Sequence, residues 1–101
     1  MMVEFSVVPV SGDEHVAKYV AEAIRVIDES GLAYRVTPMG TIVQGDWEAV
    51  MAAVKAAHER VMSMTDRVVT KIYIDETKEG EKSFDDKIQA VEEVLGKKIK
   101  V

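Results

Sequence analysis

Four stretches of the chain are rich in β-branched residues, and their side chains alternate between two faces as those of a strand do. They cover residues 3–10, 33–37, 41–44 and 67–75. Pro38 and Gly40 separate the middle two stretches. Because proline fixes its own φ and glycine supplies freedom at a tight corner, we predict a hairpin whose turn lies at residues 37–41.

Between these strands, apolar residues recur at intervals of three and four, the spacing typical of amphipathic helices. The first helix is predicted to start at Ser11, which has Glu14 at the capping-box distance, and to end at Gly31. His15 then falls in its first turn. The second helix is predicted to follow Asp46, which is a good N-cap residue.

A third helix is predicted from Ser83, with Asp86 three residues later, to a glycine cap at Gly96. Each of the three helices carries one apolar stripe and is expected to bury it. The stripes are Val16, Val20, Ala23, Ile24 and Ile27; Trp47, Val50, Ala53, Val54, Ala57 and Val61; and Phe84, Ile88, Val91 and Leu95.

The predicted order is strand, helix, strand, strand, helix, strand and helix. Its first six elements have the split βαβ arrangement of the ferredoxin-like fold. We therefore predict an α+β protein: a ferredoxin-like βαββαβ sandwich with a four-stranded antiparallel sheet and an additional C-terminal helix. A chain of 101 residues is expected to form one domain over residues 1–101.

One face of the predicted sheet would lack a covering helix. Val8, Val10, Val69 and Tyr73 would lie on that face, together with Ser6, and such a surface is too apolar to remain in water. We therefore expect a homo-oligomer, a dimer or a tetramer, that stacks two sheets. The third helix would pack at a sheet edge or on a neighbouring subunit.

Composition narrows the functional classes. The net charge of −5 disfavours binding to nucleic acid or to anionic lipid, since both require a positive field. No apolar run approaches the roughly 20 residues that span a membrane, and the N-terminal residues do not resemble a secretory signal, so we expect a cytoplasmic protein. The absence of cysteine excludes disulfides, thiolate metal sites and thiol nucleophiles.

No set of residues has the spacing of a catalytic centre, so we predict no catalytic residue, no metal site and no required cofactor. His15 and His58 lie far apart in the sequence, and a metal site would need ligands from distant elements. Whether the chain is an enzyme stays open. The alternative is an enzyme that uses a carboxylate, such as Asp75, in a cleft between subunits.

Polar side chains near the predicted hairpin suit a small heteroaromatic amine. Hydroxyl and amide groups can bond to ring nitrogens and to an exocyclic amine, and an aromatic or methionine side chain can cover the ring. The candidate ligand-binding residues are Ser6, Tyr34, Thr37, Met39, Thr41, Gln44 and Tyr73. The alternative interpretation is that Thr41 and Gln44 only complete the hairpin.

A family resemblance covers nearly the whole chain, from about Glu4 to Leu95. The segments that carry it are Val7-Val8-Pro9-Val10, Ser30-Gly31-Leu32-Ala33-Tyr34, Pro38-Met39-Gly40-Thr41-Ile42-Val43-Gln44-Gly45 and Ile72-Tyr73-Ile74-Asp75. The most specific part is the Pro-Met-Gly-Thr turn followed by a strand that ends in glycine. In these segments the chain resembles the small thiamine-binding protein family.

The resemblance implies a ferredoxin-like subunit, dimers made by sheet stacking, commonly a tetramer, and binding of thiamine or its hydroxymethylpyrimidine moiety without catalysis. Such a protein would serve as a carrier, a reservoir or a sensor of the small molecule. The family usually carries Glu where this chain has Gln44, which keeps an acceptor but lacks the charge. The remaining alternative is a structural oligomer with a vestigial pocket.

Overall fold

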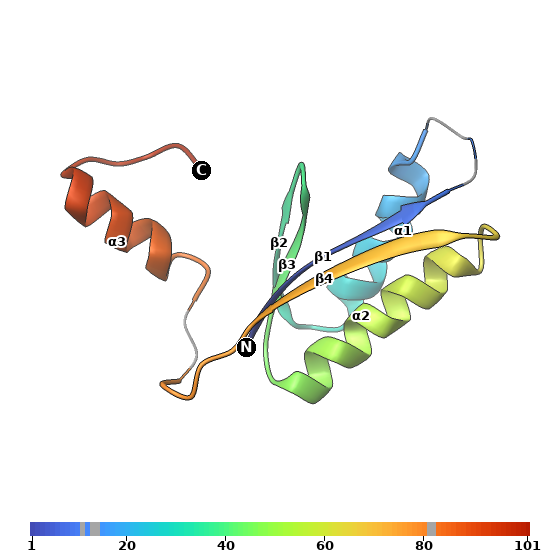
Figure 1. Ribbon diagram of the computed structural model, residues 1–101, viewed down its shortest axis with the longest axis horizontal. Helices are drawn as coiled ribbons and strands as arrows, with labels where there is room; N and C mark the ends of the chain where they lie inside the picture. The colour runs from blue at the N-terminus through green and yellow to red at the C-terminus, as the bar shows by residue number, and fades with distance from the viewer. Residues whose placement is uncertain (11, 13–14, 81–82) are drawn as a thin grey trace.

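The computed structural model covers residues 1–101 and describes all of them except residues 11, 13–14 and 81–82. The chain forms four strands and three helices in the predicted order (Figure 1). They are β1 (Met2–Pro9), α1 (Ala17–Glu29), β2 (Ala33–Thr37), β3 (Gly40–Gln44), α2 (Trp47–Met62), β4 (Val68–Asp75) and α3 (Asp86–Leu95). None of these helices is long and apolar enough to cross a membrane.

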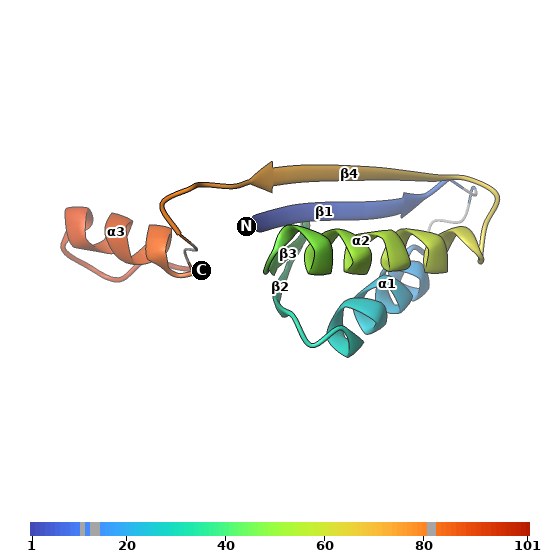
Figure 2. The ribbon, with the colours of Figure 1, turned by 90° about the horizontal axis from the view of Figure 1, so that it is seen from below.

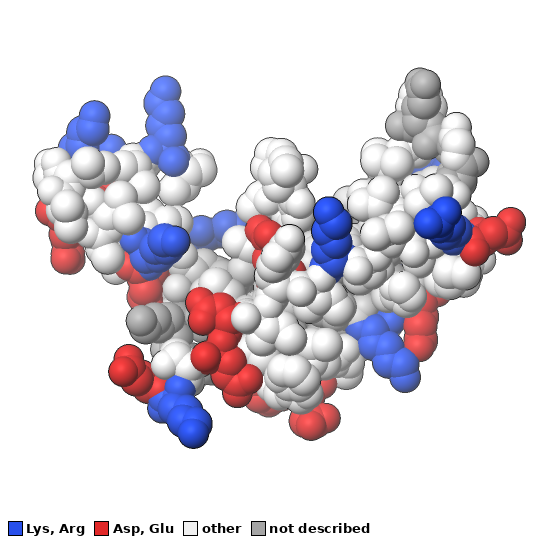
Figure 3. Space-filling view, viewed as in Figure 1, with Lys and Arg blue, Asp and Glu red and all other residues white. Residues whose placement is uncertain are grey.

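The strands form one antiparallel sheet in the order β2-β3-β1-β4. Both α1 and α2 cover the same face of this sheet, and the other face is left open (Figure 2). The α+β, ferredoxin-like prediction is therefore confirmed. Figure 3, which looks onto the open face, shows that uncharged atoms predominate over β1 and β4.

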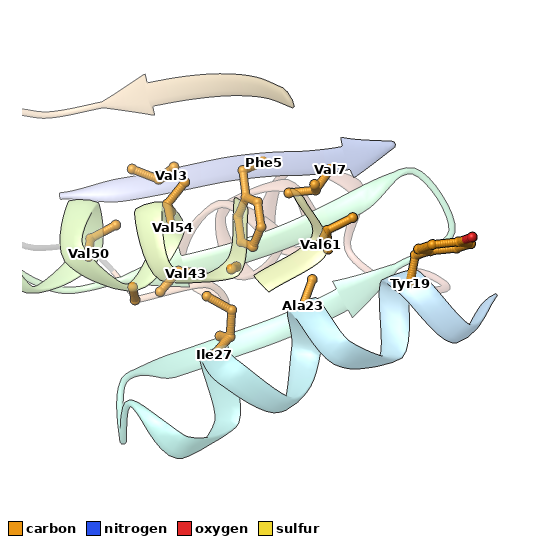
Figure 4. Packing of buried hydrophobic residues seen from close by; sticks show 12 residues of the cluster. Val3, Phe5, Val7, Tyr19, Ala23, Ile27, Val43, Val50, Val54 and Val61 are labelled. Atoms are coloured by element: carbon orange, nitrogen blue, oxygen red, sulfur yellow. The ribbon is translucent and has the colours of Figure 1, made fainter. Parts of the chain in front are cut away.

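The core lies between the sheet and the two covering helices (Figure 4). Alternate residues of β1 point into it, as the sequence pattern predicts: Val3, Phe5 and Val7 are buried. They pack with Val43 of β3 and with the buried stripe of α2. Because each fully buried valine or phenylalanine contributes about 1.5–3 kcal/mol, this layer fixes which face of the hairpin turns inward.

The first helix starts later than predicted. α1 begins at Ala17, so His15 precedes the helix instead of lying in its first turn. The predicted capping pair, Ser11 and Glu14, lies outside the described residues. Tyr19, which the predicted stripe omits, is buried in the core, whereas Val20 is 39% exposed.

The other two helices also differ in part from their predicted stripes. Trp47 at the start of α2 is exposed, although the rest of its stripe is buried. α3 stands apart from the sheet and has no buried residue within its described length (Figure 1). Arg35 on β2 holds the segment before α3, through a 3.0 Å ion pair with Asp85 and a contact with the ring of Phe84.

Candidate functional site

A cavity of about 220 Å³ opens between the β2–β3 turn, β1 and the N-terminal half of α1. Its walls are mostly apolar, and four of the predicted ligand-binding residues line it: Ser6, Thr37, Met39 and Thr41. Three exposed or half-buried residues of the predicted α1 stripe, Val16, Val20 and Ile24, form the opposite wall. These three residues of the stripe therefore face the cavity, whereas Ala23 and Ile27 are buried in the core.

The backbone of β1 contributes polar groups to the same cavity. β3 pairs with β1 only as far as Phe5, opposite Thr41. Beyond Phe5, β1 stays paired with β4, but on its cavity side it has no partner strand among the described residues. Val10 donates its N–H to the carbonyl of Arg67 at 2.8 Å, and hydrogen bonding alternates along an antiparallel ladder. The N–H and C=O of Val7 are therefore directed away from β4, toward the cavity that Val7 lines.

The turn that borders the cavity is held by Thr37. Its hydroxyl accepts hydrogen bonds from the N–H groups of Met39 (3.2 Å) and Gly40 (3.1 Å) and donates to the carbonyl of Gly40 (2.9 Å). A hydroxyl has one donor and two acceptor sites, so all are in use. Thr37 shapes the site, and its hydroxyl is not available to a ligand.

The sequence suggests that Gly40 supplies conformational freedom at the turn, but the structure shows a different requirement, which is space for the neighbouring strand. The φ of Gly40 is not positive. A Cβ atom at this position would lie 3.1 Å from the carbonyl oxygen of Phe5 and 3.4 Å from Cγ of Glu4. Glycine therefore permits the close approach of the hairpin to β1, which brings Thr41 against the cavity.

Thr41 is the polar residue most deeply placed in the cavity wall, with only 5% of its surface exposed. Within the described part of the chain, its hydroxyl makes no hydrogen bond. Since no buried side-chain oxygen or nitrogen of the described residues is left without a partner, the Thr41 hydroxyl must be open to the cavity. It is therefore available to a ligand there.

A second hollow, also about 220 Å³, lies on the open face of the sheet and adjoins the first. The two share Phe5, Ser6 and Met39. Glu4, Lys71 and Tyr73 complete the second hollow, so a carboxylate and an aromatic ring stand beside the mouth of the apolar cavity. Met39 is 85% exposed between the two hollows and could cover a ligand that occupies both.

Two of the seven predicted residues lie away from both hollows. Tyr34 donates from its hydroxyl to Asp28 at 2.7 Å, which ties β2 to the end of α1. This hydrogen bond, with smaller contributions from burial and from the charge of Asp28, raises the pKa of Tyr34 above its ordinary value. Gln44 lies at the far end of β3, opposite Met2 and Ala33 and on the open face with Ile42.

The residues of the site that were not predicted from the sequence include Glu4, Val20 and Ile24. The sequence contained a signal for Glu4, because it is an isolated charge in an otherwise apolar strand. No signal distinguished Val20 and Ile24 from core residues, since both have the spacing of the buried stripe. His58, in contrast, bonds through Nδ1 to Oγ1 of Thr70 at 2.6 Å and links α2 to β4, away from both hollows.

Several proteins match this chain over most of its length. Residues 3–92 match the family model described as thiamine-binding protein. The UPF0045 protein MJ1052 of Methanocaldococcus jannaschii is 35% identical over 93% of this chain and 94% of its own, and the UPF0045 protein Mb1933 of Mycobacterium bovis is 42% identical over 74% of each.

Two crystal structures resemble the model closely. That of MJ1052 has a TM-score of 0.84 and 36% identity, and the match covers 91% of this chain and 95% of the other. The second structure is TM0486 of Thermotoga maritima, a protein proposed to act in thiamine biosynthesis or salvage. It has a TM-score of 0.79 and 28% identity over 89% of this chain and 96% of its own.

Proposed function

Since the chain belongs to the thiamine-binding protein family, we propose that it binds thiamine or a related aminopyrimidine, such as hydroxymethylpyrimidine, and releases it chemically unchanged. The observation that carries this proposal is the hydroxyl of Thr41, which opens to an apolar cavity and has no partner among the described residues. In this role the protein is a cytoplasmic carrier, reservoir or sensor that needs no cofactor or nucleic acid.

The cavity would take the aminopyrimidine ring. Its volume of about 220 Å³ is below the roughly 300–1,000 Å³ typical of pockets for drug-sized ligands, so it suits one ring with the rest of the molecule outside. The hydroxyl of Thr41 and the backbone groups of Val7 can both donate and accept. They match a ring that carries acceptor nitrogens and a donor amine.

The cationic thiazolium of thiamine would lie over the second hollow. Glu4 and Lys71 bring opposite charges to this hollow, so the cation would lie on the side of Glu4. Tyr73 supplies an aromatic face, which attracts a cation by about 0.5–1 kcal/mol at an exposed site. Met39 would cover the join between the two rings. On this proposal, Glu4 contributes the carboxylate that this chain lacks at Gln44.

The open face is proposed to stack against that of another copy, giving the dimer or tetramer expected from the sequence. Val8, Val69 and Tyr73 lie exposed on it. Burial of these side chains between two sheets would remove a continuous apolar surface from water and close the second hollow from above. Light scattering at micromolar concentration tests this part, and a monomer would contradict it.

A thermal-shift titration followed by recovery of the ligand tests the proposed function. Thiamine at 100 times its dissociation constant should stabilise the protein by about 2.7 kcal/mol, which raises the melting temperature by roughly 10–20 °C in a domain of this size. Chromatography of the recovered ligand should show intact thiamine. Turnover would favour the enzyme that uses Asp75, and no shift with any aminopyrimidine would favour the structural oligomer.

A further inference from the structure

Two charged side chains of opposite sign line the second hollow, and the proposed function gives a role to only one of them. Glu4 on β1 is proposed to face the cation, whereas Lys71 on β4 has no assigned role. Both lie on the open face, where uncharged atoms predominate over these two strands (Figure 3). Within the described residues, neither forms an ion pair with the other or with a third side chain. The charge of Lys71 is therefore available to an anionic group of a ligand.

The register between β1 and β4 divides the hollow into two halves. Glu4 lies directly opposite Tyr73, and Ser6 lies directly opposite Lys71. Side chains directly opposite each other have Cβ atoms about 4.5–5.5 Å apart, whereas positions two residues apart along a strand are separated by about 7 Å. One half therefore holds a carboxylate and an aromatic ring, and the other half holds a hydroxyl and an ammonium group.

Ser6 and Lys71 offer hydrogen-bond donors that nothing in the described part of the chain uses. The Ser6 hydroxyl makes no hydrogen bond there, and since no buried side-chain oxygen is left without a partner, it is open to the hollows that it lines. The ammonium of Lys71 has three donors and no acceptor. A hydroxyl and an ammonium on side chains about 5 Å apart at Cβ can bond two oxygens of one phosphate, and lysine is a common phosphate ligand.

We propose that the protein prefers a phosphate ester of its ligand, with the phosphate held by Ser6 and Lys71 and the cationic ring held by Glu4 and Tyr73. The phosphate monoester of thiamine has this chemistry. Its phosphate is joined to the thiazolium by a short two-carbon arm, so that the positive ring and the negative group occupy neighbouring positions. This inference rests on the proposed function and adds a phosphate to the ligand.

The charges of the hollow favour such an ester over thiamine itself. Thiamine brings a single positive charge, which Glu4 attracts and Lys71 repels. In the ester, each charge of the ligand lies beside the opposite charge of the protein. Ser6 and Met39 line both hollows, so the pyrimidine, the thiazolium and the phosphate would follow one continuous path from the cavity to Lys71.

Calorimetric titration with thiamine, its phosphate monoester and inorganic phosphate tests the inference at fixed salt and pH. The unaltered protein should bind the ester about tenfold more tightly than thiamine, which is about what one hydrogen bond to a charged group contributes. Inorganic phosphate should bind far more weakly than the ester, because it lacks the rings. Lys71→Gln should abolish the preference for the ester, and Lys71→Arg, which keeps the charge, should retain most of it.

Lys87→Gln is the matched control, because it removes the same charge from an exposed position on α3 that lines neither hollow. It should keep the preference. Equal or weaker binding of the ester would overturn the inference and leave the proposed function standing, whereas binding of neither thiamine nor the ester would overturn both. A preference that Lys71→Gln and Lys87→Gln keep alike, or inorganic phosphate that binds as tightly as the ester, would also overturn the inference.

Discussion

The two ends of the β2–β3 hairpin are built from similar residues and have different roles. At the turn end, the Thr41 hydroxyl opens to an apolar cavity and has no partner among the described residues, and the turn is held by Thr37. At the far end, Val43 is buried in the core, and Tyr34 is bonded to Asp28. The hydroxyl of Tyr34 at the far end therefore has a partner, whereas that of Thr41 at the turn end has none among the described residues.

Polar residues of one hairpin therefore cannot be assigned to a site as a group. Thr37 and Thr41 both line the cavity, but only Thr41 keeps its hydroxyl for a ligand. Gln44 is on the same strand as Thr41 and faces the opposite side of the sheet. If the site is at the turn end, changes there should alter affinity, whereas matched changes at the far end should alter only stability.

The largest effect is expected from adding one methyl group at each glycine that bounds β3. Gly40→Ala would place Cβ 3.1 Å from the carbonyl oxygen of Phe5, and Gly45→Ala would place it 3.0 Å from Leu32 and 3.2 Å from Val50. Each should lower the free energy of unfolding by about 1–3 kcal/mol, as overpacking does. Only Gly40→Ala should also weaken thiamine binding, because it moves the cavity wall.

Urea unfolding and calorimetric titration of both variants measure these two quantities. Equal losses of affinity in the two glycine variants would remove the contrast between the ends of the hairpin.

The next-largest effect is expected from replacing a hydroxyl by a methyl group at Thr41 and a methyl group by a hydroxyl at Val43. Thr41→Val removes the hydroxyl that opens to the cavity and keeps the shape of the side chain. Thiamine affinity should therefore fall about tenfold, or about 1.4 kcal/mol, while stability is kept. Val43→Thr introduces an unpaired hydroxyl into the core, so stability should fall by about 1–3 kcal/mol with affinity unchanged.

Both variants can be compared by calorimetry at a temperature where each is folded. Full affinity in Thr41→Val would show that its hydroxyl does not contact the ligand.

Substitutions of Gln44 should have smaller effects. In a single subunit it lines neither hollow, so Gln44→Glu and Gln44→Leu should leave thiamine affinity unchanged and shift stability by no more than about 0.5 kcal/mol. Calorimetric titration at fixed salt and pH checks this. Tighter binding by Gln44→Glu together with weaker binding by Gln44→Leu would instead place Gln44 in a site completed by another subunit.

The pH dependence of Tyr34 gives the smallest expected effect. Its pKa is raised above 10.0 by the hydrogen bond to Asp28, so its contribution to stability is present at lower pH and is lost as the pH rises through the raised pKa. Wild type and Tyr34→Phe should therefore converge in stability at alkaline pH. Denaturant titrations at several pH values, with binding measured alongside, should show no change in thiamine affinity at neutral pH.

Periodicity was sufficient to predict the sheet, because the core depends on alternation in β1 and β3 and on the spacing in α2. It could not separate the two uses of the α1 stripe, since Val20 in the cavity wall and Ile27 in the core have the same spacing pattern. Nor could it show that Thr37 and Thr41 differ, because that depends on which backbone groups the turn brings within reach.

The central claim is that thiamine lies at the turn end of the hairpin, and the methionine methyl resonances test it most directly. Met39 lines both hollows, whereas Met62 lies at the end of α2 and lines neither. With methyl-labelled methionine, a thiamine titration should shift the Met39 resonance saturably and leave that of Met62 in place. A Met39 resonance that stays unchanged while thiamine binds, or no shift at millimolar thiamine, would contradict the account.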